Sequence, residues 1–300
     1  MPVFDSATSV SKFSSIPYLS LDTSALARHQ LFHKLVDHIP SFRFIHDSLS
    51  AKLRAMGISI AILVSVFLTS TLSGLLGMAG GMILMAILLA LLSVPATMIL
   101  HGAVQATANG SRAWFLRRHI AWVVLPPYLL GAGAALALFI WLTITPNEGL
   151  ILIVIGLFPW LARALPRLRG LDVTKPQTAL ICGLVVTAAQ LFAGVSGPLL
   201  DVFYLNSKLD RFGVIASKAL TQALGHILKL VYWGGVIGVS DSLPPLLIAM
   251  AMLAAVLGTR LGTKLLAQWN QAGFQKWSSA VILSIATICL VRGVTLLLLA

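Results

Sequence analysis

Two apolar segments of this sequence carry polar residues at regular intervals. In segment 96–116 they follow at spacings of four, four and three: His101, Gln105, Asn109 and Arg112. In segment 213–238 the same spacings separate Lys218, Gln222, His226 and Lys229. Such spacings place side chains on one face of a helix, so each segment is predicted to present a polar stripe. Amide, imidazole and cationic groups can all donate hydrogen bonds to an anion.

Glycines interrupt the chain just before two short apolar runs. The stretch SGLLGMAGGM covers residues 73–82 and FAGVSGPLL covers 192–200. Glycine lets backbone approach a ligand closely, and a helix that begins there offers free amides and the positive end of its dipole to an anion. Glycine in membrane helices also serves close packing between helices. Both interpretations stay open at this point.

The composition indicates an all-α polytopic membrane protein. Of 300 residues, 58% are hydrophobic and 10% charged, and no compact soluble core could hide so much apolar surface. The net charge of +12 comes from basic residues that fall mainly between apolar runs, where they orient helices and meet anionic lipid headgroups. We therefore expect the chain to interact with the lipid bilayer and not with nucleic acid. Cys182 and Cys289 lie in apolar surroundings and are expected to be packing residues.

Apolar runs bounded by polar and glycine-containing stretches predict ten helices. Their ranges are 56–76, 82–93, 96–116, 120–142, 149–165, 177–194, 198–207, 213–238, 244–268 and 277–299. The runs 82–93 and 198–207 are too short to span a bilayer. Setting Gly77 on Gly194 aligns Gly80 with Gly197 and Gln105 with Gln222 without a gap. The chain is therefore predicted to contain two related halves.

The distribution of basic residues predicts how the halves are oriented. Clusters around Arg117, Arg163 and Arg260 mark cytoplasmic loops, while Glu148 and Asp241 mark the outside. If each half has about four membrane segments and 149–165 connects them, the halves are inverted, as in many transporters. The predicted domains are an N-terminal extension over 1–54, a first repeat over 55–145, a connecting helix and cytoplasmic loop over 146–172, and a second repeat over 173–300.

The N-terminal extension contains an amphipathic stretch, TSALARHQLFHKLVDHI, at residues 23–39. Its apolar residues fall on roughly one helical face, so we expect it to lie on the membrane surface. Four histidines occur in or after it: His29, His33, His38 and His46. Because no cysteine or glutamate completes a familiar ligand set, we predict no metal site there and no cofactor elsewhere.

The two stripes and the two glycine breaks together define a candidate substrate site near the middle of the membrane. Its predicted residues are Gly77, Gly80, Gly81, His101, Gln105, Asn109, Gly194, Ser196, Gly197, Lys218, Gln222 and His226. Lys218 lies inside an apolar segment, so it either contacts the ligand or extends to the cytoplasmic surface. Arg112 and Lys229 lie nearer the helix ends and are interpreted as orienting charges. Asp201 is a candidate for a coupled proton or for a pair with a lysine.

The first half also resembles a known family. The segment GLLGMAGGMILMAILLALLSVPATMILHGAVQATANGSRAWFLRRHIAW, followed by a second glycine-broken half, is similar to the TauE/SafE family of sulfite exporters. The resemblance covers about residues 56–299. It implies a secondary transporter of the cell inner membrane that moves a sulfur-containing anion, such as sulfite or an organosulfonate, out of the cell with the proton gradient. In the second half, Pro198 stands where another glycine is common.

Two other functions fit parts of the sequence. Residues 194–197 match the GxSG motif of rhomboid intramembrane proteases, and His226 lies on a later helix where a base could activate Ser196. Against a protease, the equivalent motif at 77–80 has no serine, so we do not expect an enzyme. An anion channel would use the same polar stripes without alternating access.

Overall fold

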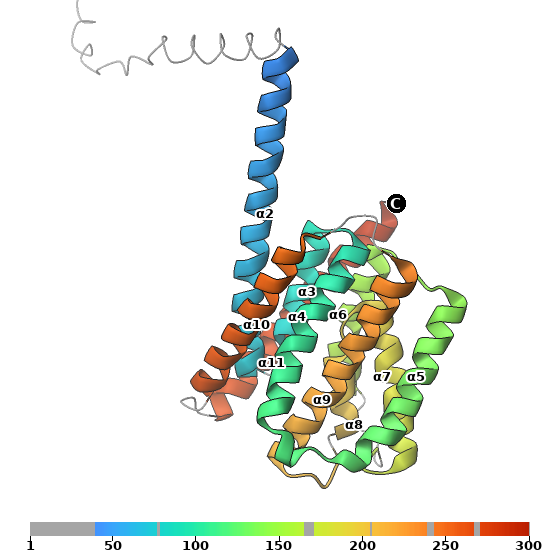
Figure 1. Ribbon diagram of the computed structural model, residues 1–300. Helices are drawn as coiled ribbons and strands as arrows, with labels where there is room; N and C mark the ends of the chain where they lie inside the picture. Colours follow the sequence, from blue (N-terminus) through green and yellow to red (C-terminus); the bar gives the residue numbers. More distant parts are fainter. Residues whose placement is uncertain are drawn as a thin grey trace, which may run out of the picture. The chain divides into compact units, whose positions relative to one another are not determined.

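The computed structural model describes residues 40–76, 79–164, 171–204, 206–238, 243–266 and 271–299. All regular elements within these ranges are helical, which confirms the predicted all-α class (Figure 1). The chain divides into two compact units, Met1–Gly57 and Ile58–Ala300, which are described separately. Of the first unit, the described residues are the first part of helix α2. The predicted amphipathic stretch at 23–39 lies outside the described residues.

Each of the ten predicted helices has a counterpart. The helices are α2 (Pro40–Leu76), α3 (Ala79–Leu91), α4 (Val94–Phe115), α5 (Leu125–Leu142), α6 (Glu148–Ala164), α7 (Pro176–Ala193), α8 (Gly197–Tyr204), α9 (Arg211–Leu230), α10 (Pro245–Leu266) and α11 (Gln271–Leu298). Two short 3₁₀ turns, η1 (Arg117–His119) and η2 (Trp122–Val124), join α4 to α5, and the π-helical segment η4 (Val231–Ile237) continues α9. The first helix begins well before the predicted residue 56.

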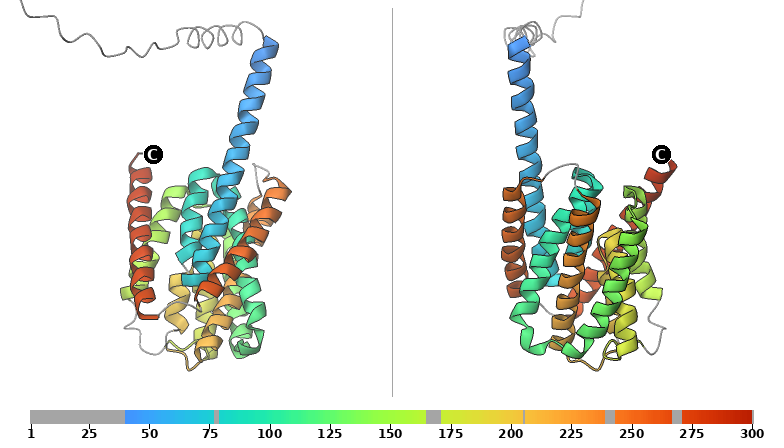
Figure 2. Two further views of the ribbon diagram at one scale, coloured as in Figure 1. Left: turned by 90° about the vertical axis from the view of Figure 1, so that its left-hand side faces the viewer. Right: turned by 45° about the vertical axis from the view of Figure 1, so that its right-hand side comes forward.

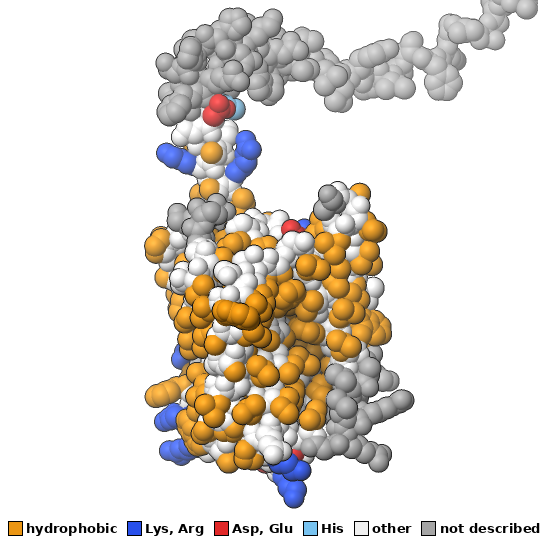
Figure 3. Space-filling view, turned by 90° about the vertical axis from the view of Figure 1, so that its right-hand side faces the viewer, with side chains coloured by type: hydrophobic (Ala, Val, Ile, Leu, Met, Phe, Trp, Pro, Cys, Tyr) orange, Lys and Arg blue, Asp and Glu red, His pale blue; other side chains and the backbone are white. Residues whose placement is uncertain are grey.

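Six of the described helical segments are long and apolar enough to cross a membrane. They are His46–Gly74, Trp122–Leu142, Pro176–Ala193, Arg211–Ile237, Pro245–Leu265 and Ser279–Leu298. Helix α4 has 22 residues but is not among them, because its polar stripe interrupts the apolar sequence. The chain is therefore a multi-pass membrane protein. Figure 3 shows hydrophobic side chains over the flank of residues 58–300, with lysines and arginines gathered towards one end.

The second unit is built around an antiparallel pair, α4 and α9 (Figures 1 and 2). Two contacts give the direction of the pair. Lys229 contacts His101 at one end, and the amide of Ala121 donates to the Ser217 hydroxyl at the other. Helix α5 packs on α7, α6 on α11, and α10 on α4.

Glycines let two of the outer helix pairs approach closely. A Cβ at Gly131 of α5 would lie 2.0 Å from the Leu180 carbonyl oxygen of α7, and one at Gly183 would lie 2.0 Å from the Tyr128 carbonyl oxygen. In α2 and α10, a Cβ at Gly74 or Gly258 would likewise meet backbone oxygen of the other helix, at 2.7 and 2.5 Å. Without a hydrophobic driving force between helices in lipid, such backbone contact supplies much of the packing.

Candidate functional site

A cavity lies where α3, α4, α9 and the start of α8 meet. The space between the lining residues, together with open solvent outside it, is about 330 Å³. The lining consists of Ser73, Gly81, Met82, His101, Gln105, Asn109, Val195, Ser196, Gly197, Gln222 and His226. Eight of the twelve predicted binding residues are therefore brought together here. Of the other four, Gly77 lies outside the described residues, and Gly80, Gly194 and Lys218 do not line the cavity.

Two helices begin at this cavity and run to opposite ends of the unit. Gly81 and Met82 stand in the first turn of α3, and Ser196 and Gly197 stand at the start of α8. Helix α3 leads directly to the start of α4, and α8 leads to the start of α9. Because α4 and α9 are antiparallel, α3 and α8 diverge from the cavity. Both N-terminal ends, with their free amides and positive dipole ends, therefore face the same space.

Helix α4 supplies one polar wall of the cavity. Asn109 Nδ2 donates to the Gln105 carbonyl oxygen at 3.0 Å and approaches Gln105 Oε1 at 3.5 Å. Gln105 is 4% exposed, and its Nε2 has no hydrogen-bond partner in the described part of the chain. A buried amide donor without a partner is costly in free energy. Gln105 therefore offers a hydrogen-bond donor to whatever occupies the cavity.

Helix α9 supplies the opposite wall. His226 is 5% exposed, and its Nδ1 is a second buried polar atom without a partner among the described residues. The imidazole rings of His226 and His101 lie 5.5 Å apart at an angle of 59°. Gln222, one turn earlier on α9, completes this side of the lining. The two stripes thus face one another across the cavity.

Lys229 was interpreted from the sequence as an orienting charge near a helix end, but the structure buries it next to the cavity-lining His101. It is fully buried, and its Nζ lies 2.8 Å from His101 Nδ1 and donates to the Gly194 carbonyl oxygen at 3.1 Å. The interpretation as an orienting charge fails because η4 continues the helix beyond Leu230. Lys229 therefore lies within the membrane span. Its spacing of three from His226 was the signal that could have identified it.

The partners of His101 define its tautomer. His101 Nε2 lies 2.9 Å from the Gly81 carbonyl oxygen, which can only accept a hydrogen bond. Nε2 therefore carries the hydrogen, and in a neutral ring Nδ1 accepts from Lys229. His101 thus connects the first turn of α3 to the buried lysine of α9.

The remaining charges near the two stripes have partners of their own. Lys218 forms an ion pair with Asp201 of α8, and both side chains are partly exposed. Of the two predicted roles for Asp201, the structure places it in a lysine pair. Arg112 donates to the Ser73 carbonyl oxygen at 3.2 Å, in the last turn of α2. A cation there satisfies one of the carbonyl groups left free at a helix C-terminus.

Glycines of the two breaks differ in what they do. A Cβ at Gly80 would lie 1.9 Å from the Thr69 carbonyl oxygen, so Gly80 lets α3 pack against α2. Gly194 adopts a left-handed φ of 75° and ends α7, where its amide donates to the Gln190 carbonyl oxygen. Gly81 lines the cavity. The packing interpretation therefore holds for Gly80, while Gly194 turns the chain and presents its carbonyl to Lys229.

Ser196 and Gln190 form a hydrogen-bonded pair at the second break. The Ser196 hydroxyl donates to Gln190 Oε1 at 2.5 Å. Gln190 Nε2 in turn lies 3.5 Å from the Gln222 carbonyl oxygen. The Ser196 hydroxyl is therefore directed to Gln190 and not to His226, unlike the nucleophile and base of a serine hydrolase.

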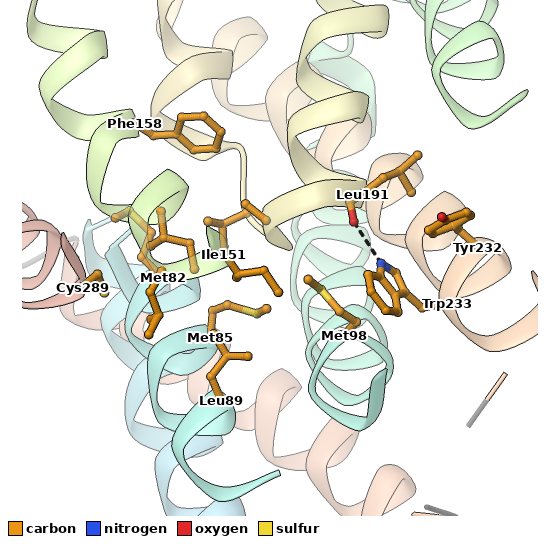
Figure 4. Packing of buried hydrophobic residues seen from close by; sticks show 14 of the residues in the cluster. Met82, Met85, Leu89, Met98, Ile151, Phe158, Leu191, Tyr232, Trp233 and Cys289 are labelled. Carbon is orange, nitrogen blue, oxygen red and sulfur yellow. Dashed lines mark hydrogen bonds between the residues drawn. The ribbon is translucent and has the colours of Figure 1, made fainter. Parts of the chain in front are cut away.

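An apolar cluster lies one turn beyond Lys229 and His101 on their helices. Trp233, one turn after Lys229, donates its ring N–H to the Leu191 carbonyl oxygen at 2.9 Å (Figure 4). Met82, Met85 and Met98 belong to the same cluster. At the other end of the α9 stripe, Lys218 and Gln222 are partly exposed.

Comparison of the chain with models of known protein families, with curated proteins and with solved structures gave no match.

Proposed function

We propose that this protein is a secondary-active transporter of a small anion. One observation carries the proposal: among the described residues, the lining of the central cavity contains hydrogen-bond donors and no carboxylate. Gln105 Nε2 is a buried donor that has no partner among the described residues, and the fully buried side chain of Lys229 stands next to His101. A cation site would instead be expected to collect carboxylate and carbonyl oxygens.

The broken helices favour a transporter over a channel. Helices α3 and α8 begin at the cavity and end at opposite sides of the unit. Discontinuous helices whose N-terminal ends meet at a central site are typical of secondary transporters, in which one part of the protein moves against the other.

We propose further that the chain consists of two inverted repeats. If α2–α6 corresponds to α7–α11, the glycine-mediated contact of α5 with α7 has its equivalent in the contact of α10 with α2. The pairs α4 with α9 and α6 with α11 then lie on the repeat axis. This arrangement gives each repeat five helices and places α6 within the first repeat. From the sequence, 149–165 had been predicted to be a connector between the halves.

The substrate follows from the resemblance to the TauE/SafE family. We propose a sulfur-containing anion, sulfite or an organosulfonate, exported across the cell inner membrane with coupling to protons. The three oxygens of such a group can accept hydrogen bonds from both stripes and from the amides at the two helix starts. The basic end of the unit is then the cytoplasmic end.

Transport by reconstituted protein tests the proposal. Proteoliposomes would be assayed for uptake of radiolabelled sulfite and of isethionate, a sulfonate without a second ionisable group, in parallel with protein-free liposomes. We expect saturable uptake that either unlabelled anion inhibits. The absence of saturable uptake of both anions, together with flux of a cation, would contradict the proposed function. Conductance without saturation would indicate the channel alternative.

A further inference from the structure

Lys229 carries a buried amine whose contacts within the described chain include no anionic group. Its side chain is fully buried, and its Nζ contacts a neutral imidazole nitrogen of His101 and a backbone carbonyl oxygen of Gly194. An ammonium group removed from water without an anionic partner is costly in free energy. The missing charge has to come from a ligand, or the amine has to be uncharged when no ligand is present.

Within the described part of the chain, the ionisable groups around Lys229 offer it no carboxylate. His101 of α4 and His226 of its own helix face it. The sequence of α3 has no ionisable residue. On the other described elements packed against α9, the remaining ionisable groups are Arg112 of α4, Arg117, Arg118 and His119 of η1, and Tyr128, Cys182, Asp201, Tyr204 and Tyr232. Asp201, the carboxylate of this set, pairs with Lys218. Lys218 lies eleven residues before Lys229, about 16 Å along the helix.

The hydrogen bonds of Lys229 match those of an uncharged amine. An uncharged amine has two N–H groups and an ammonium has three. The two contacts to His101 and Gly194 occupy two donors. Protonation would add one further donor and one positive charge beside His101, which lines the cavity. The added charge would attract an anion held in the cavity next to His101.

We propose that Lys229 takes up one proton when an anion enters the cavity and releases it when the anion leaves. The inference rests on the proposed function, since it requires an anion between the α4 and α9 stripes. The proton binds to the Lys229 amine, and no bond to the anion is formed. A monoanion and this proton then cross together in the same direction and without net charge, so the sum of the two concentration gradients sets the direction of transport. Lys229, and not Asp201, is then the residue that links anion movement to protons.

Counting protons during binding tests this inference. The full-length protein in detergent would be titrated with isethionate and with sulfate, both fully ionised near neutral pH, in buffers that differ in ionisation enthalpy. Calorimetry in such a buffer series gives the number of protons taken up. We expect about one proton per bound anion, and affinity that falls about tenfold per unit rise in pH wherever Lys229 is uncharged in the free protein.

Three variants assign the proton to a residue. Lys229→Arg carries a permanent charge, so it should still bind the anion but take up no proton. Lys229→Met should take up no proton and bind at least about tenfold more weakly. The control is Lys264→Met, which removes an exposed cation of α10 and should take up protons like the parent. If Lys229→Met does not fold, the parent and Lys229→Arg still decide the question.

Three results would overturn the inference. Isethionate binding by the parent without proton uptake would leave the proposed function standing and remove the role of Lys229. The same holds if Lys229→Arg takes up as many protons as the parent, because the proton then binds elsewhere. If neither anion binds, the inference fails with the anion site, and the vesicle assay then decides whether sulfite is transported at all.

Discussion

Lys218 of α9 and Asp201 of α8 form an ion pair. Helix α8 is the short helix that follows the second glycine break. Helix α8 has only eight residues and starts at the cavity with Gly197. The pair therefore ties this short helix to the first half of α9. Lys218 also interacts with a further group, but it is absent from the cavity lining. Replacing Lys218 is therefore expected to change stability and the position of α8 more than it changes anion affinity.

Replacing one member of this pair should lower stability. Asp201→Asn removes the carboxylate opposite Lys218, whose side chain is 19% exposed. Because both groups are partly exposed, we expect a loss of about 1–3 kcal/mol, below the value for a fully buried pair. Thermal unfolding in detergent measures it. The double variant Asp201→Asn with Lys218→Met should recover part of the loss, and strictly additive effects would mean that the two residues do not interact.

Changing Gln105 to glutamate should weaken anion binding. The substitution keeps the side chain's shape but replaces the unpartnered Nε2 donor with a carboxylate oxygen. Loss of the donor and repulsion of the ligand should together cost about 2–4 kcal/mol, roughly 30-fold to 1,000-fold in affinity. Isothermal calorimetry with isethionate measures the change. The matched control is Gln177→Glu, at an exposed position in the first turn of α7. Equal affinity of both variants would place the anion elsewhere.

Removing the Ser196 hydroxyl separates its structural role from a catalytic one. Ser196→Ala leaves Gln190 Oε1 without its donor, so we expect the free energy of unfolding to fall by about 1–3 kcal/mol. Saturable anion uptake should remain, because the helix starts and the α4 stripe are intact. The control, Ser111→Ala, removes a hydroxyl that bonds within its own helix. Cleavage of transmembrane peptides by the parent but not by Ser196→Ala would instead favour the protease alternative.

Two glycines on the same helix should respond oppositely to alanine. In Gly131→Ala, the new Cβ would lie 2.0 Å from the Leu180 carbonyl oxygen, so α5 and α7 have to separate. We expect destabilisation of about 1–3 kcal/mol or more. A Cβ at Gly133 would meet no neighbouring helix of the described chain within 4 Å, and Gly133→Ala should be neutral or stabilising by up to about 1 kcal/mol. Thermal unfolding of the two variants side by side tests the α5–α7 contact, and equal unfolding temperatures would contradict it.

The helices could be predicted from the sequence because each depends on local features. The apolar runs, the loops between them and the glycines at 194 and 197 indicated ten helices in the correct order. The polar residues with which α4 faces the site could also be predicted from the sequence, because His101, Gln105 and Asn109 repeat at helical spacing. The residues that they contact could not be predicted, because the spacing along one helix does not indicate which neighbouring helix lies against it. The Ser196–Gln190 hydrogen bond and the Lys218–Asp201 pair both depend on that placement.

For Lys229, the sequence determined its place on the polar stripe of α9, and the tertiary structure decided its burial. The sequence alone determined that a cation continues the stripe of α9, three residues after His226, because helical periodicity is a property of the chain itself. It did not determine whether that cation reaches water. The π-helical continuation through Ile237 and the packing of α4 against α9 place it against His101 and Gly194. A lysine has a long, flexible side chain that can reach the surface or turn inward, so only the position of the neighbouring helices decides between an anchor and a buried charge.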